Sequence, residues 1–118
     1  MQDTNLTNVV RAYLGAYESE NREAVETLLA DDFTFTSPHD DAIDKATYFE
    51  RCWPDSDARR DHAIESIVVE GEKAFVTYRC ATANGKSFRN TEFLTFKGER
   101  IASVNVYFGA AYQDGVLM

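Results

Sequence analysis

The chain has 118 residues, of which 44% are hydrophobic and 27% are charged, and its formal net charge at pH 7 is −8. This length and apolar content predict a single globular domain spanning residues 1–118, with a core large enough to fold without a metal ion or a disulfide. The acidic balance argues against nucleic acid and anionic membranes as partners, because both select surfaces rich in lysine and arginine.

The N-terminal segment and the two cysteines bear on where the protein resides. Residues 1–8 are polar and lack the basic start and apolar run of a secretory signal, and no stretch is long enough to span a bilayer. Cys52 and Cys80 lack C-x-x-C spacing, which favours reduced, buried thiols, with one disulfide as the alternative. We therefore expect a cytoplasmic protein without a membrane segment.

Helical periodicity dominates the first half of the chain. One set of apolar residues recurs at helical spacing and predicts an amphipathic first helix. Its members are Leu6, Val9, Val10, Tyr13, Leu14 and Tyr17. Asp3 or Thr4 can cap the start of this helix, and Asn21 can cap a shorter second helix that ends near Ala30.

A first strand and a third helix are expected next. The run Phe33–Ser37 alternates apolar and polar residues, as in a strand, and Pro38 ends it. The segment Lys45–Cys52 has helical spacing, with Asp44 as its cap and Pro54 as its stop.

Strand periodicity dominates the second half, after a polar loop at residues 53–61. The expected strands and turns are, in order, His62–Glu70, Gly71, Lys73–Ala83, Asn84-Gly85, Ser87–Phe96, Lys97-Gly98 and Ile101–Phe108. Helices followed by an antiparallel meander predict an α+β fold with the helices packed on one face of the sheet. The other face would expose Phe93 and Tyr107, so we expect a homodimer that forms through the sheet.

The order of these elements resembles the nuclear transport factor 2-like superfamily. The local sequences VVRAYLGAY, LLADDF and VNVYFG and the Ser-Pro step after the first strand carry the resemblance, which covers nearly the whole chain. It points to the SnoaL-like polyketide cyclases and the ketosteroid isomerases. The implied fold is a curved antiparallel sheet wrapped around three N-terminal helices, a cone with an apolar pocket inside. Since this fold hosts many unrelated functions, the resemblance implies less about activity.

Ketosteroid isomerases imply particular site residues. In that group a tyrosine on the first helix and a protonated acid on a late strand hold an oxyanion, and a carboxylate before the proline acts as base. Tyr13 and Glu92 occupy the first two positions here, although Tyr13 could equally be a plain core aromatic. Ser37 occupies the base position, and a hydroxyl cannot take a proton from carbon without an activating partner.

Glu92 has two possible environments. Alternation places it on one strand face with Asn90, Leu94 and Phe96. If that face is concave, burial raises the pKa of the carboxyl and makes it a general acid or a neutral donor. If the face is convex, Glu92 forms a salt bridge between subunits. Arg79 is either an edge charge in solvent or a pocket cation that pairs with Glu92 and keeps it ionised.

His39, Asp40 and His62 are the candidates for moving a proton. His39 and Asp40 follow Pro38 in an acidic loop expected at the pocket mouth, where they supply a base or simply cap the next helix. His62 could reach the pocket from the opposite wall or be a structural histidine. Their spacing matches no metal-binding motif, so neither a metal nor another cofactor is expected.

The remaining candidates form the ligand-binding wall. Phe35, Trp53 and Phe108 match pocket positions of the superfamily, with plain core packing as the alternative. The other expected ligand contacts are Ser37, His62, Arg79 and Asn90. These residues favour a cofactor-free isomerase, dehydratase or cyclase that acts on a small apolar carbonyl or hydroxyl compound. The alternative is a non-catalytic ligand-binding or dimerisation module of the same fold.

Overall fold

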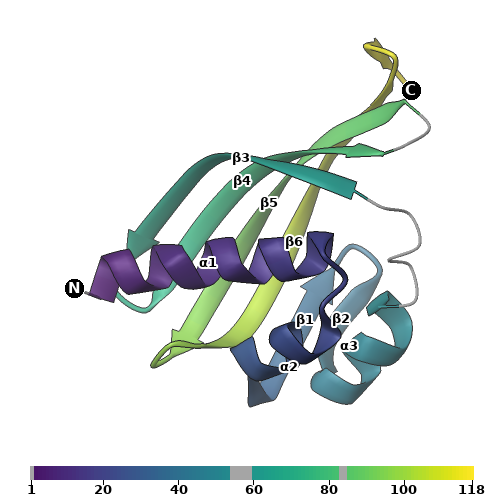
Figure 1. The fold of residues 1–118 in the computed structure, drawn as a ribbon. Helices are drawn as coiled ribbons and strands as arrows, with labels where there is room; N and C mark the ends of the chain where they lie inside the picture. Colours follow the sequence, from purple (N-terminus) through teal and green to yellow (C-terminus); the bar gives the residue numbers. More distant parts are fainter. Residues whose placement is uncertain (1, 54–59, 83–84) are drawn as a thin grey trace.

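The computed structural model describes residues 2–53, 60–82 and 85–118. In chain order the elements are α1 (Gln2–Glu18), α2 (Arg22–Leu28), β1 (Leu29–Ser37), β2 (Asp40–Asp44), α3 (Lys45–Cys52), β3 (Arg60–Glu70), β4 (Lys73–Thr82), β5 (Lys86–Lys97), β6 (Arg100–Gln113) and β7 (Val116–Leu117). Figure 1 shows α1 lying along the sheet, with α2 and α3 beside β1 and β2.

The three expected helices are confirmed. The side chain of Asn21 caps α2 by accepting from the backbone N–H of Ala24, at 3.1 Å. Asp44 caps α3 in the same way by accepting from Thr47, at 2.8 Å. The caps expected for the first helix are wrong, because α1 already begins at Gln2 and so includes residues 3 and 4. The expected stop at Pro54 and the start of the Asn84-Gly85 turn lie outside the described residues.

The strands differ from expectation at several places. β1 already begins at Leu29, ahead of the expected Phe33, and β3 begins at Arg60, within the segment expected as a loop. β2 occupies Asp40–Asp44, where an acidic loop was expected, and pairs antiparallel with β1 through Phe35 and Ile43. Acidic residues are poor strand formers, but the hydrogen bonds of the β1 ladder outweigh that preference. β6 continues to Gln113 and is followed by the short strand β7, which the sequence pattern did not reveal.

All seven strands form one curved, unclosed sheet in the order β2-β1-β6-β5-β4-β3, with β7 paired to β6. Neighbouring strands run antiparallel except β1 and β6, which run parallel. The parallel pair arises because the chain passes from β1 through β2, α3 and three further strands before it returns beside β1. The predicted α+β fold with a curved, largely antiparallel sheet against three helices is confirmed.

Alternation in β4 and β5 decides which side chains face the helices. On β4 the inward residues are Ala74, Val76, Tyr78 and Cys80, each at most 4% exposed. On β5 they are Asn90, Glu92, Leu94 and Phe96, which are also buried. The outward face is apolar as well: Phe75 is 48% exposed and stacks on Phe93 at 4.7 Å, and Tyr107 is 59% exposed.

Candidate functional site

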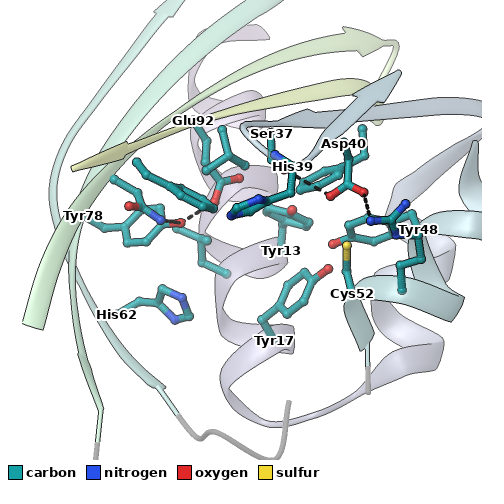
Figure 2. A pocket seen from close by; sticks show the side chains of 16 residues that line it. Tyr13, Tyr17, Ser37, His39, Asp40, Tyr48, Cys52, His62, Tyr78 and Glu92 are labelled. Carbon is teal, nitrogen blue, oxygen red and sulfur yellow. Dashed lines mark hydrogen bonds and ion pairs between the residues drawn. The ribbon is translucent and has the colours of Figure 1, made fainter. Parts of the chain in front are cut away.

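A cavity of about 520 Å³ lies between the concave face of the sheet and the helices. Its volume falls within the usual range for small-molecule sites. The expected site residues that line it are Tyr13, Phe35, Ser37, His39, Asp40, His62, Asn90, Glu92 and Phe108. Figure 2 shows Tyr13 from α1, His62 from β3 and Glu92 from β5 converging on one space.

Glu92 lies on the sheet wall of this cavity and is 5% exposed. Its Oε2 accepts a hydrogen bond of 2.5 Å from the hydroxyl of Tyr78, which in turn accepts from Asn90 at 3.4 Å (Figure 2). Its Oε1 is buried and has no hydrogen-bond partner among the described residues. Burial raises the pKa of Glu92 to about 7, and the bond from Tyr78 offsets part of the rise. The expectation of a buried carboxyl in the pocket matches this geometry.

Tyrosine hydroxyls from the helices complete this wall. Tyr13 on α1 and Tyr48 on α3 are almost fully buried. Burial raises the pKa of both phenols well above the usual value, so both stay neutral proton donors. The Tyr17 ring lies 5.3 Å from that of Tyr13, and its buried hydroxyl has no partner within the described chain.

A charged cluster forms the mouth side of the cavity. The carboxylate of Asp40 accepts from Ser37 at 3.1 Å and pairs with the Arg51 guanidinium at 2.9 Å. The Asp40 side chain is only 8% exposed, so the carboxylate end of the ion pair is buried. The ion pair links β2 to α3. His39 is exposed and lies beside Phe108, with ring centres 6.0 Å apart.

His62 lines the opposite side of the cavity and is held from α1. Its backbone N–H donates to Glu18 Oε1, and the same oxygen lies 3.2 Å from the His62 Nδ1. The imidazole packs edge-on against the ring of Tyr78, with centres 5.0 Å apart. His62 therefore connects the end of α1 to the wall that carries Glu92.

Two expected contacts are wrong. Arg79 is exposed on the outward face of β4, because odd positions of that strand point away from the helices. It therefore cannot pair with Glu92. Trp53 does not line the cavity but packs behind Tyr17, with ring centres 5.3 Å apart.

The structure also adds residues that sequence reasoning missed, namely Tyr78, Tyr48, Arg51 and Glu18. Tyr78 could have been found from the alternation of β4, which places Tyr78 and Arg79 on opposite faces. The other three carry no such signal, because their roles come from contacts between α1, α3 and the sheet.

No group of three or more metal-ligating side chains occurs in the part of the chain that the structure describes. Cys52 and Cys80 form no disulfide in the described part of the chain, in line with the reduced thiols that their spacing favours. No helix among the described residues is both long and apolar enough to cross a bilayer.

Comparisons with known proteins identify the family to which the chain belongs. The SnoaL-like domain model matches residues 10–104, so the chain belongs to the SnoaL-like family of the nuclear transport factor 2-like superfamily. A search of curated protein sequences found no match.

Several solved structures share the fold at low sequence identity. A candidate ketosteroid isomerase from Kribbella flavida superposes with a TM-score of 0.81 at 16% identity, over 96% of this chain and 84% of that one. A candidate polyketide cyclase from Sinorhizobium meliloti gives 0.71 at 21%, over 85% and 94%. A protein from Catenulispora acidiphila with a ketosteroid isomerase-like fold, solved with trimethylamine, gives 0.70 at 19%, over 86% and 85%. At these identities the likeness concerns the fold.

Proposed function

We propose that the cavity binds a small, largely apolar molecule with a carbonyl or hydroxyl oxygen and catalyses proton transfer on it without a cofactor. Isomerisation, dehydration and cyclisation are the reactions of this class. The observation that carries the proposal is the buried Glu92 carboxyl, with its pKa near 7 and an oxygen without a partner in the cavity. The names of the neighbours, a candidate isomerase and a candidate cyclase, support the same class.

Glu92 and Tyr13 supply hydrogen bonds to the ligand oxygen. Because Oε2 accepts from Tyr78, the proton of the neutral carboxyl is best placed on Oε1, where it can be donated to a ligand. Tyr13, also in the cavity wall, adds a second neutral donor. Donors fixed in a water-poor cavity stabilise negative charge that develops on the oxygen more strongly than water does. The proton-moving group comes from His39, Asp40 or His62, which share the cavity.

Hydrogen exchange at carbon tests this proposal without knowledge of the natural substrate. 1-Tetralone, a bicyclic ketone of suitable size, is incubated in D₂O and its α-protons are followed by NMR. We expect the protein to accelerate exchange and Glu92→Gln to lower the rate about a hundredfold or more, as for the loss of one oxyanion donor. Glu72→Gln, an exposed turn residue, is the matched control. Equal rates for wild type and Glu92→Gln would dismiss the acid role.

A non-catalytic binding module is the second candidate, and one observation favours it. The position that carries the base in ketosteroid isomerases is Ser37, whose hydroxyl donates to Asp40. Under this hypothesis 1-tetralone binds, as shown by shifts in protein NMR signals, but its α-protons exchange no faster than in buffer. Native mass spectrometry of freshly purified protein would show whether an apolar ligand is retained.

We also propose that two copies associate through the outward face of the sheet. Val68, Phe75, Phe93 and Tyr107 give that face an apolar surface, and burying it against a second copy would remove it from water. Light scattering should give the mass of a dimer at micromolar concentration, and Phe75→Lys should shift it to a monomer. A monomeric wild type would contradict the proposal.

A further inference from the structure

The contacts of the three proton-moving candidates differ in a way that singles out one of them. Asp40 has both oxygens engaged, one by Ser37 and the other by Arg51. His39 is exposed at the mouth, where water competes for its ring. The His62 side chain is only 12% exposed, and its ring lines the cavity on the side opposite Asp40 (Figure 2).

The position of the Glu18 carboxylate assigns a tautomer to His62. At 3.2 Å from Oε1, Nδ1 is within reach to donate its proton to the carboxylate. A neutral imidazole carries a proton on only one nitrogen, so this bond leaves the basic lone pair on Nε2. The second bond to the same oxygen, from the His62 backbone N–H, fixes the carboxylate relative to the ring.

The same arrangement connects His62 to the proposed acid. Among the described residues, His62 contacts Glu18 on α1 and Tyr78 on β4, and Tyr78 in turn donates to Glu92 on β5. A base and the proposed acid are thus carried by residues on one wall of the cavity.

We propose that His62 is the base that takes a proton from the carbon of the bound ligand, and that Glu18 is its positioning residue. Glu18 is not among the described residues that line the cavity, so it acts through the imidazole. This inference rests on the proposed function and names the base that the proposal left open.

The proton transfer balances within these residues and the ligand. Nε2 takes the proton from the carbon next to the carbonyl, and the electrons of the broken C–H bond form the enolate π bond. The negative charge moves to the ligand oxygen, which accepts hydrogen bonds from Glu92 and Tyr13. The imidazolium then returns the proton to carbon, at the same or at a conjugated position, and the neutral histidine is restored.

NMR of the two histidines tests the positioning role directly. The chain contains only His39 and His62, so a His39→Gln variant assigns both imidazoles. Long-range ¹H–¹⁵N spectra should show the Nδ1–H tautomer for neutral His62 in the wild type. Glu18→Ala should abolish this preference, whereas Glu18→Gln, whose amide oxygen still accepts, should keep it. An Nε2–H tautomer in the wild type, or no change in Glu18→Ala, would overturn the assignment.

The exchange assay separates this inference from the proposed function. We expect His62→Gln to lower the exchange rate of 1-tetralone at least about a hundredfold, as expected for the loss of a general base, while Glu72→Gln, on an exposed turn outside the cavity, leaves it unchanged. Glu18→Gln should lower kcat with KM unchanged, because it removes a charge and no ligand contact. Fast exchange in His62→Gln together with loss in Asp40→Asn would make Asp40 the base. Wild-type exchange no faster than in buffer would contradict the proposed activity, whereas the tautomer result would still decide the role of Glu18.

Discussion

The two carboxyl groups of the cavity, Glu92 and Asp40, are both almost inaccessible to water but have opposite partners. Glu92 is contacted by a neutral phenol, and burial raises its pKa to about 7. Asp40 is instead paired with the guanidinium of Arg51, at 2.9 Å. Two buried acids of one cavity therefore differ in the partner that contacts the carboxyl, and the charge of the partner is one of the factors that set whether an acid serves as a donor or as an anion.

The pH dependence of stability tests the neutral state of Glu92, and we expect it to show the largest effect. The unfolded chain ionises Glu92 near pH 4.5, whereas the folded protein keeps the proton until about pH 7. Between these values the folded state binds the extra proton, so its stability falls as pH rises, by about 3 kcal/mol in total. Glu92→Gln cannot ionise and should lack this loss.

Urea unfolding of both proteins between pH 4 and 8 measures the difference, because contributions from the other carboxyl groups cancel in the comparison. Glu72→Gln serves as the control and should follow the wild type. A stability difference between wild type and Glu92→Gln that stays constant with pH would show that Glu92 is ionised in the folded protein at neutral pH.

Removal of the partner of Asp40 should have the next largest effect. Arg51→Met leaves a buried carboxylate with a single hydroxyl donor, and we expect a loss of about 2 kcal/mol, less than for a fully buried pair because Arg51 is 54% exposed. Adding Asp40→Asn should restore part of the loss, and a double-mutant cycle by urea unfolding measures the coupling. Additive effects would mean that the pair contributes nothing to stability.

Tyr78→Phe removes the hydrogen-bond partner of Glu92 and should have a smaller effect on stability than the loss of the partner of Asp40. The hydrogen bond from Tyr78 lowers the pKa of Glu92, so its removal should raise that pKa further. We expect a loss of about 1 kcal/mol at pH 4.5 and a higher pKa in a ¹³C NMR titration of the Glu92 carboxyl. An unchanged or lower pKa of Glu92 in Tyr78→Phe would contradict the hydrogen bond between Tyr78 and Glu92.

Arg79→Gln should have the smallest effect. Arg79 points outward from β4, away from both carboxyls, and exposed substitutions of this kind stay within about 0.5 kcal/mol. The pKa of Glu92 should also be unchanged in the same titration. A clear drop in that pKa would restore the pairing of Arg79 with Glu92 that the structure excludes.

Local signals in the sequence predicted most of the fold. The caps at Asn21 and Asp44 and the apolar spacing of α1 are interactions between near neighbours, so they can be seen without tertiary structure. β2 was missed because its acidic residues oppose strand formation and only pairing with β1 offsets this. The parallel pairing of β1 with β6 was missed for a related reason, since it joins segments far apart in the chain.

The site was predictable only where alternation determines the face. The alternation of β5 placed Glu92 beside Asn90, and the structure shows both facing the cavity. The same rule applied to β4 would have replaced Arg79 with Tyr78. Trp53 was wrongly expected to line the cavity. Helical spacing predicts the side of the helix on which a residue lies, but it does not predict that Trp53 packs behind Tyr17.

The sequence by itself determined the three helices, most of the strands and the alternation that puts Glu92 on one strand face with Asn90, because capping and periodicity are local properties. Only the tertiary structure decided the partners of the titratable groups, namely Tyr78 for Glu92, Arg51 for Asp40 and Glu18 for His62. The residues of each pair belong to separate elements, so local sequence does not reveal them as partners. The free energy of protonating each group depends on which charge or dipole lies within a few ångströms of it.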